Sequence, residues 1–164
     1  MTHLNLRSMP LAAAVVLTLL MTAPAHAQFQ KPEDAIDYRQ SAFTVLASHF
    51  GRVAAMAQGK VPFDPSAAMA NTAIARTMAP LPFAGFAAGT DKGLPQRAKP
   101  EVWSDAARFK TLSEDMVAAM AKLDTAAKTG DLEQVKAAVG ATGKACKACK
   151  ACHDDFRAEK FSSN

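Results

Sequence analysis

The stretch IDYRQSAFTVLASHFGRVAAMA, residues 36–57, decides the fold. Its apolar residues recur every seven positions along two seams, which is the pattern of a helix that packs lengthwise against other helices. The two seams hold Ile36, Phe43, Phe50 and Ala57, and Leu46 and Val53. Arg39 occupies a seam position where an apolar residue is expected. Its permanently charged side chain either bends out to solvent near the start of the helix or points inward toward an anionic group.

Turn residues on either side set the limits of this helix and predict three more. Pro32 suits a first helical turn and Gly59 ends the helix, which gives it a span of about 32–58. The second helix is expected at about 65–78, the third from 103 or 104 to 130, and the fourth from a cap at Asp131. A connection of about twenty residues, rich in proline and glycine, separates the second helix from the third. The sequence therefore predicts an all-α fold, an antiparallel four-helix bundle that can hold a cofactor between facing helices.

Residues 1–27 have the three parts of a cleaved export signal. Arg7 provides the positive charge, residues 11–21 the apolar run, and Ala25-His26-Ala27 the cleavage site. The apolar run is about half of the ~20 residues that a membrane-spanning helix needs. We therefore expect a signal peptide over 1–27, one bundle domain over 28–164, and a periplasmic protein with no membrane attachment after cleavage.

The charge pattern limits the partners. The formal net charge is +4, but no nucleic-acid-binding motif accompanies it, so nucleic acid is not an expected partner. Lysines cluster near the C-terminus and form either a solvated face or a surface that steers an acidic redox partner. They are Lys144, Lys147, Lys150 and Lys160.

The same region contains Cys149-Lys150-Ala151-Cys152-His153, a C-x-x-C-H pattern. In an exported chain this pattern is typical of covalent attachment of a c-type haem. The two thiols form thioethers with the haem vinyl groups, and the imidazole ligates the iron. A zinc site that also uses Cys146 is the weaker alternative, because cysteines three residues apart along one helix do not easily close a tetrahedron.

Four segments together carry a family resemblance: KPEDAIDYRQ (31–40), SHFGR (48–52), WSD (103–105) and CKACHDDFR (149–157). With these segments, essentially the whole exported chain resembles the cytochrome c′ family. The resemblance implies one covalent haem c, with its iron, near the C-terminus of a four-helix bundle. It also implies a homodimer that forms through the first two helices.

The resemblance implies roles for the C-x-x-C-H residues and their neighbour. Cys149 and Cys152 would carry the thioethers, and His153 would be the proximal iron ligand. Arg157 would lie beside that histidine.

Three residues of the first helix would complete the haem site. Arg39 would lie near the haem propionates, and Gln40 belongs to the same stretch as a further haem contact. Phe43 would cover the distal face of the iron, and it also fits a plain core position.

The expected function follows from Phe43, because a phenyl ring offers iron no lone pair. The iron would then be five-coordinate and high-spin, open to nitric oxide or carbon monoxide. The alternative is a periplasmic electron-transfer cytochrome. A haem enzyme such as a peroxidase is not expected, because no distal histidine–arginine pair can be assigned.

A sixth protein ligand to the iron would favour electron transfer. His49 lies beyond Phe43 and off the main seam, which makes it a poor ligand. The methionines of the exported chain fit core stripes instead. They are Met56, Met69, Met78, Met116 and Met120.

Cys146 is surplus to haem attachment. Compared with the family pattern, the stretch 131–153 is three residues longer, as if one Lys-Ala-Cys unit were inserted. Three residues turn a helix by ~300°, so we expect the fourth helix to rotate, overwind or bulge, with Gly140 and Gly143 absorbing the change. We expect Cys146 to stay unligated, with a thiol that can misdirect haem attachment or link two copies.

Overall fold

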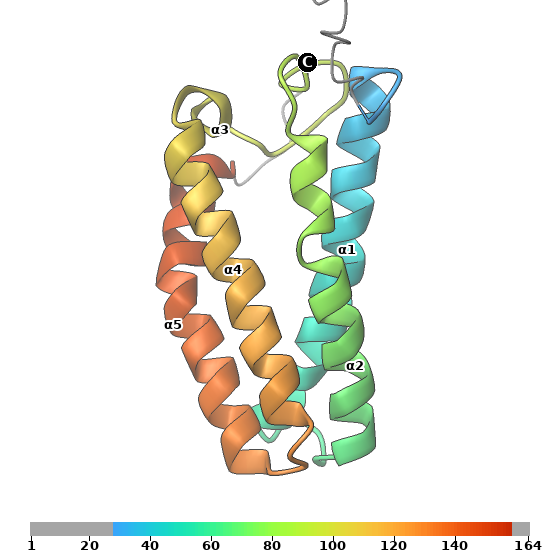
Figure 1. The fold of residues 1–164 in the computed structure, drawn as a ribbon, viewed down its shortest axis with the longest axis vertical. Coiled ribbons are helices and arrows are strands. Elements are labelled where there is room, and N and C mark those ends of the chain that lie inside the picture. The colour runs from blue at the N-terminus through green and yellow to red at the C-terminus, as the bar shows by residue number, and fades with distance from the viewer. Residues whose placement is uncertain (1–27, 159–164) are drawn as a thin grey trace, which may run out of the picture.

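The computed structural model describes residues 28–158, and for residues 143–152 and 154 it describes the backbone alone. Four long helices run alternately up and down (Figure 1). They are α1 (Pro32–Ala57), α2 (Pro65–Met78), α4 (Ala106–Ala127) and α5 (Leu132–Phe156). The all-α antiparallel bundle is thus confirmed. The predicted signal peptide lies outside the described residues.

The connection from α2 to α4, residues 79–105, crosses the end of the bundle (Figure 1). It contains the short 3-10 helix η1 (Leu81–Gly85) and the short helix α3 (Glu101–Ser104). We call residues 79–100 the crossover segment. The third predicted helix is divided at its start, because Asp105 has φ −120° and ψ 51°, outside the helical region, and separates α3 from α4.

Local signals fix the other helix ends as predicted. Pro32 opens α1, and Gly59 with φ +69° follows its end. The Asp64 carboxylate accepts a hydrogen bond from the Ala67 N–H at 3.0 Å and caps α2. The Asp131 carboxylate caps α5 by accepting from the N–H groups of Glu133 and Gln134. Each cap satisfies backbone donors that have no partner inside the helix.

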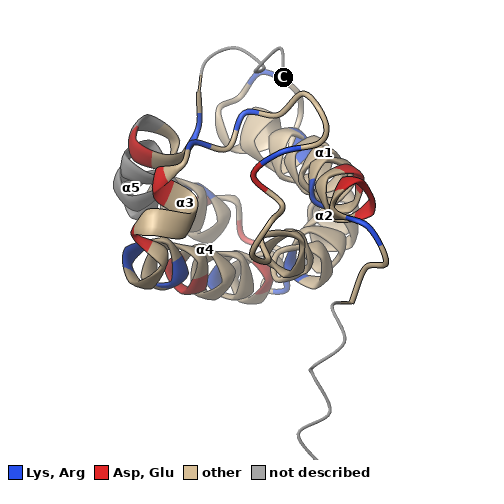
Figure 2. Cartoon of the chain, turned by 90° about the horizontal axis from the view of Figure 1, so that it is seen from above, with Lys and Arg blue, Asp and Glu red and all other residues tan. Residues whose placement is uncertain are grey.

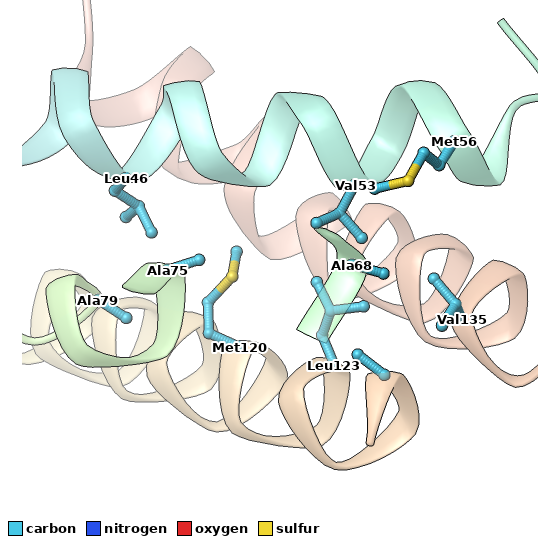
Figure 3. Close-up of a cluster of buried hydrophobic side chains, with 10 residues drawn as sticks. Leu46, Val53, Met56, Ala68, Ala75, Ala79, Met120, Leu123 and Val135 are labelled. Carbon is cyan, nitrogen blue, oxygen red and sulfur yellow. The ribbon is translucent and has the colours of Figure 1, made fainter. Parts of the chain in front are cut away.

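The core lies between α1, α2, α4 and α5, where Figure 3 shows side chains from all four helices meeting. Both seams of α1 are confirmed as inward-facing, because Ile36 and Val53 are completely buried and Phe43 and Phe50 pack against the core. The buried residues of this core are Leu46, Val53, Met56, Ala68, Ala75, Ala79, Met120, Leu123, Ala127 and Val135. Among the described residues, no helix is long and apolar enough to cross a membrane.

The predicted core position of Met69 in α2 is wrong. Met69 and Ile74 are each 41% exposed, whereas Ala68, Thr72 and Ala75 are buried. Small side chains on the inner face let α2 approach its neighbours closely, and the larger side chains of Met69 and Ile74 lie on the outer face. An alanine-rich helix has more than one apolar stripe, so the periodicity alone did not select the buried one.

Helix α5 continues from Leu132 to Phe156 without a 3-10 or π turn. The bulge considered for Gly140 and Gly143 is therefore absent from the described backbone. Val135 is completely buried and Val139 packs against the core, so this face of the first turns of α5 points inward.

Asp124 of α4 is a buried carboxylate, 1% exposed, that the sequence did not reveal. It accepts hydrogen bonds from Lys128 at 2.7 Å, Arg76 at 3.2 Å and the Thr72 hydroxyl at 3.4 Å. Burial alone would raise the pKa of Asp124, but the hydrogen bonds and charges of Lys128 and Arg76 outweigh it and hold this pKa below its usual value. The cluster therefore joins α2 to α4 as long as Asp124 is ionised.

We predict that Asp124→Asn lowers the free energy of unfolding at pH 7 by about 1–2 kcal/mol, because hydrogen bonds between charged groups are lost. A depressed carboxyl pKa stabilises the fold above the pKa of the unfolded chain, and this stabilisation is lost as the pH falls through the folded value. The difference between the two proteins should therefore shrink in acid. Urea unfolding of the holoprotein measures it, with Asp115→Asn on the exposed side of α4 as the control. Equal stability of the two variants at pH 7 would contradict the prediction.

Candidate haem site

The predicted haem-binding residues share one turn near the end of α5. The backbone is α-helical through residues 149–153, so Cys149 and Cys152 are three positions apart and His153 is four positions after Cys149. Residues at these spacings lie on one side of a helix. The His153 side chain is exposed. The zinc alternative and the expectation for Cys146 concern the side chains of Cys146, Cys149 and Cys152, which lie outside the described residues.

Arg157 ends this helix. It is the C-cap of α5, and its backbone N–H donates to the His153 carbonyl at 3.2 Å. Partial burial lowers the pKa of the Arg157 guanidinium, and the charge of nearby Arg97 lowers it further. Arg157 therefore lies one turn from His153, as the spacing predicted, beside a second cation.

The crossover segment is tied to the end of α5. Ala98 and Arg157 form an isolated antiparallel bridge. The Lys99 N–H donates to the Phe156 carbonyl at 2.8 Å, and Arg97 Nε donates to the Ala158 carbonyl at 2.8 Å. The backbone after the C-x-x-C-H turn is thereby held against a segment some sixty residues earlier in the chain.

An aromatic cluster lies where α1, η1, α4 and α5 come together, and we define it as Phe43, Phe83, Phe86, Phe109 and Phe156. The Phe43 ring meets Phe83 edge-on, with centroids 5.8 Å apart. Phe86 and Phe109 are 4.9 Å apart, and Phe109 and Phe156 are 5.4 Å apart. Phe156 follows His153 by three residues, so ring contacts connect Phe43 to the haem-binding turn. Of these residues, the sequence predicted only Phe43 as part of the site.

Arg39 lies inside the protein, with only 2% of its surface exposed. Of the two interpretations of this seam position, the one in which its side chain bends out to solvent is wrong. The Arg39 guanidinium donates to the carbonyls of Gly85 at 2.5 Å and Thr90 at 2.9 Å, to the Thr90 hydroxyl at 3.0 Å, and to the Gln96 amide oxygen. These four acceptors are neutral, and burial lowers the pKa of the guanidinium to about 10. At neutral pH it therefore remains a cation.

The same guanidinium lies over the aromatic cluster. Its central carbon is 4.4 Å from the Phe86 ring centroid and 5.6 Å from that of Trp103. Such contacts favour a cation that has left water. Trp103 is fixed in turn by donating from Nε1 to the Ala87 carbonyl at 3.1 Å.

Other contacts hold the crossover segment against α1. Gln40 Nε2 donates to the Pro95 carbonyl at 3.0 Å. A Cβ on Gly85 would lie 2.5 Å from the Ala35 carbonyl oxygen and 2.8 Å from Arg39 Cβ, so only glycine permits this approach. Thr90, Gln96 and Gly85 escaped the sequence reasoning, because isolated polar residues and glycines in a loop carry no periodic signal.

The alternative iron ligands point elsewhere. His49 Nδ1 is 2.8 Å from Asn71 Oδ1, at the contact of α1 with α2. Met56 and Met120 are buried in the core, and Met78 and Met116 pack against it. These four methionines have the core positions that the sequence predicted, and Met69 is the exception described above.

The described residues fit a haem. A large apolar macrocycle needs apolar walls, which the aromatic cluster provides between α1 and α5. Its carboxylates need a cation nearby, and Arg39 is a buried cation at the edge of that cluster. The donor set of two thiols and one imidazole on a single helical turn is the chemistry of c-type attachment.

Comparisons with known proteins agree with this site. The family model for cytochrome c′ matches residues 34–157. A cytochrome c′ from Rubrivivax gelatinosus is 62% identical over 115 residues, which cover 70% of this chain and 89% of the relative. The crystal structure of a cytochrome c′ from that organism has a TM-score of 0.75 at 61% identity and covers 79% of this chain and 99% of its own.

A third similar protein is a nitric oxide complex of a single-residue variant of cytochrome c′ from Alcaligenes xylosoxidans. Its TM-score is 0.72 at 45% identity, and the match covers 81% of this chain and all of that one. The agreement of the family model, the relatives and the structures spans the bundle and the C-x-x-C-H turn. The chain therefore belongs to the cytochrome c′ family, the c-type cytochromes that carry one covalently bound haem c with its iron.

Proposed function

We propose that this protein is an exported, periplasmic cytochrome c′ that binds nitric oxide or carbon monoxide at an apolar face of its haem. Cys149 and Cys152 hold the haem, and His153 is the iron ligand on the proximal side. Arg157 lies beside that ligand, and Arg39 and Gln40 lie on the side of the propionates. The bound haem supplies an iron with one open position.

One observation carries the proposal: Phe43 projects from α1 into a cluster of phenyl rings. Its neighbours Phe83 and Phe86 are hydrocarbon rings as well, at 5.8 and 6.3 Å between centroids. Rings of this kind neither ligate iron nor offer a proton to a bound ligand, so they favour small neutral molecules over anions and dioxygen. The nitric oxide complex of the Alcaligenes relative supports the same ligand class.

The same surroundings support binding rather than catalysis. Peroxidase-type chemistry needs a general acid or base at the ligand. The Arg39 terminal nitrogens donate to four neutral acceptors, all in the crossover segment, and the Phe86 ring contacts both Arg39 and Phe109. We therefore assign this protein no enzymatic role.

An electron-transfer role is the second candidate, and the charge distribution favours it. Figure 2 shows Lys and Arg along the crossover segment at the end of the bundle that holds the C-x-x-C-H turn. Arg97, Lys99 and Arg157 meet there. Such a surface suits an acidic redox partner.

We predict that the ferric holoprotein has a five-coordinate, high-spin absorption spectrum at neutral pH, and that Phe43→His converts it to a six-coordinate, low-spin one. The new imidazole would supply the lone pair that the phenyl ring lacks. Phe50→His is the matched control, because Phe50 lies two turns further along the same seam, about 10 Å away, and should leave the spectrum unchanged. A low-spin wild-type spectrum would overturn the gas-binding proposal and favour electron transfer.

We predict thioether bonds at Cys149 and Cys152 and none at Cys146. Mass spectrometry of the haem peptide measures this directly. Cys146→Ser should keep one haem per chain and remove any disulfide-linked dimer, whereas Cys149→Ser should lose one thioether. A thioether at Cys146 in the wild-type protein would contradict the assignment.

We also propose a homodimer that forms through α1 and α2. Where these antiparallel helices meet at His49 and Asn71, Val45 and Ile74 lie about one turn further along, at the same level of the bundle. Both are exposed, by 40% and 41%. Exposed apolar side chains on both helices at one level of the bundle are available for a subunit contact.

We predict that Ile74→Glu lowers the dimer affinity at least tenfold, because a carboxylate would be buried without a partner. Sedimentation velocity at several concentrations measures the affinity. Thr125→Glu, on the exposed face of α4, is the control with the same added charge. A wild-type protein that stays monomeric at high concentration would sink the dimer proposal.

A further inference from the structure

The cation of Arg39 is held by two loop residues to which no role has been assigned. We propose that Thr90 and Gln96 are positioning residues that fix the Arg39 guanidinium as an unneutralised positive charge beside the aromatic cluster, and that this charge stabilises the haem carboxylates and the reduced haem through space. The inference rests on the proposed haem site and deepens it.

The hydrogen bonds leave the guanidinium little freedom. Nη1 donates to the Gly85 carbonyl and the Thr90 hydroxyl, and Nη2 donates to the Thr90 carbonyl and the Gln96 amide oxygen. Both terminal nitrogens are therefore fully engaged. A bidentate ion pair between Arg39 and a haem carboxylate would require these hydrogen bonds to break. Arg39 therefore acts on the haem through its electric field, without leaving its hydrogen-bonded position.

The acceptors are themselves held in place. The Thr90 hydroxyl donates to the Ala87 carbonyl at 2.7 Å, and Gln96 Nε2 donates to the Asp91 carbonyl at 2.5 Å. The amide orientation of Gln96 is thus fixed, with its oxygen toward Arg39. Threonine and glutamine solvate the cation as water would, without cancelling its charge.

The charge is close enough to act on a haem. Arg39 lies 4.4 Å from the Phe86 centroid, and ring contacts continue through Phe109 to Phe156, three residues from His153. Arg39 also precedes Phe43 by one turn of α1. In an interior where water is excluded, charges interact far more strongly than in solution, and salt screens them little.

The decisive variant is Gln96→Glu, which has nearly the same shape and places a carboxylate against Arg39 Nη2. Cancelling the cation should favour the ferric haem, because reduction removes one positive charge from the iron. We expect the reduction equilibrium of the holoprotein to shift about tenfold toward the ferric form, ~59 mV for one electron. Gln134→Glu is the matched control: it adds the same charge in the first turn of α5, at the opposite end of the bundle, and should leave the potential unchanged.

A second variant tests positioning separately. Gln96→Leu keeps the volume but removes the acceptor, so the guanidinium is released toward solvent. The potential should fall toward that of Gln96→Glu and become dependent on salt, because an exposed charge is screened. Hydrogen exchange of residues 85–96 in the holoprotein, followed by mass spectrometry, should show faster exchange in this variant.

The outcomes distinguish a failure of this inference from a failure of the proposed haem site. A haem-loaded Gln96→Glu protein with the wild-type potential would overturn this inference and leave the gas-binding site untouched. If Gln96→Glu does not fold, the comparison passes to Arg39→Lys and Arg39→Gln: the proposal expects lysine to retain the potential and glutamine to lower it, and equal potentials would overturn it. A chain that takes up no haem overturns the proposed function and this inference together.

Discussion

The burial of one cation organises the functional end of this bundle. Arg39 projects from the second turn of a helix whose other inward residues are apolar, and taking a guanidinium out of water is costly unless its donors are satisfied. Gly85, Thr90 and Gln96 satisfy them from the crossover segment. A connection that would otherwise lie loosely over the bundle is thereby fixed on α1, and it brings Phe83 and Phe86 to Phe43. The aromatic walls of the site thus depend on a polar contact.

The opposite end of the bundle is stabilised by tight turns and by packing of small side chains. There the turns are short, Gly59 and Gly130 have positive φ angles, and the α2 face consists of alanine and threonine. Close packing of small side chains holds the helices, and Asp124 links α2 to α4 through Arg76 and Lys128. The two ends are therefore held in different ways: one by close packing of small side chains, and the other by a buried cation and an aromatic cluster beside the haem-binding turn.

The sequence predicted what depends on neighbouring residues and missed what depends on distant ones. Pro32, Asp64 and Asp131 act within one turn of themselves, so the starts of α1, α2 and α5 lie where the sequence predicted them. Arg39 was recognisable as a misplaced charge, but its partners lie 46 to 57 residues away in an irregular segment, where no periodicity reveals contacts. Asp124 follows the core residue Leu123, and a charged residue at such a position is normally on the surface. Its burial depends on Lys128 and Arg76, which lie beside it only in the folded structure. The inner face of α2 was misassigned because alanine offers no size contrast.

The bridge between Ala98 and Arg157 has a consequence for the order of assembly. At the far end, neighbouring helices are joined by tight turns, so their contacts close short loops. At the haem end, the crossover segment meets α1 and the end of α5 across separations of 57 and 61 residues, respectively. Closing long loops costs more chain entropy and slows folding. Contacts between the helices should therefore form first near the tight turns and last at the haem end. The C-x-x-C-H turn is then the last part to be enclosed, and it stays accessible longest to the enzymes that attach a cofactor.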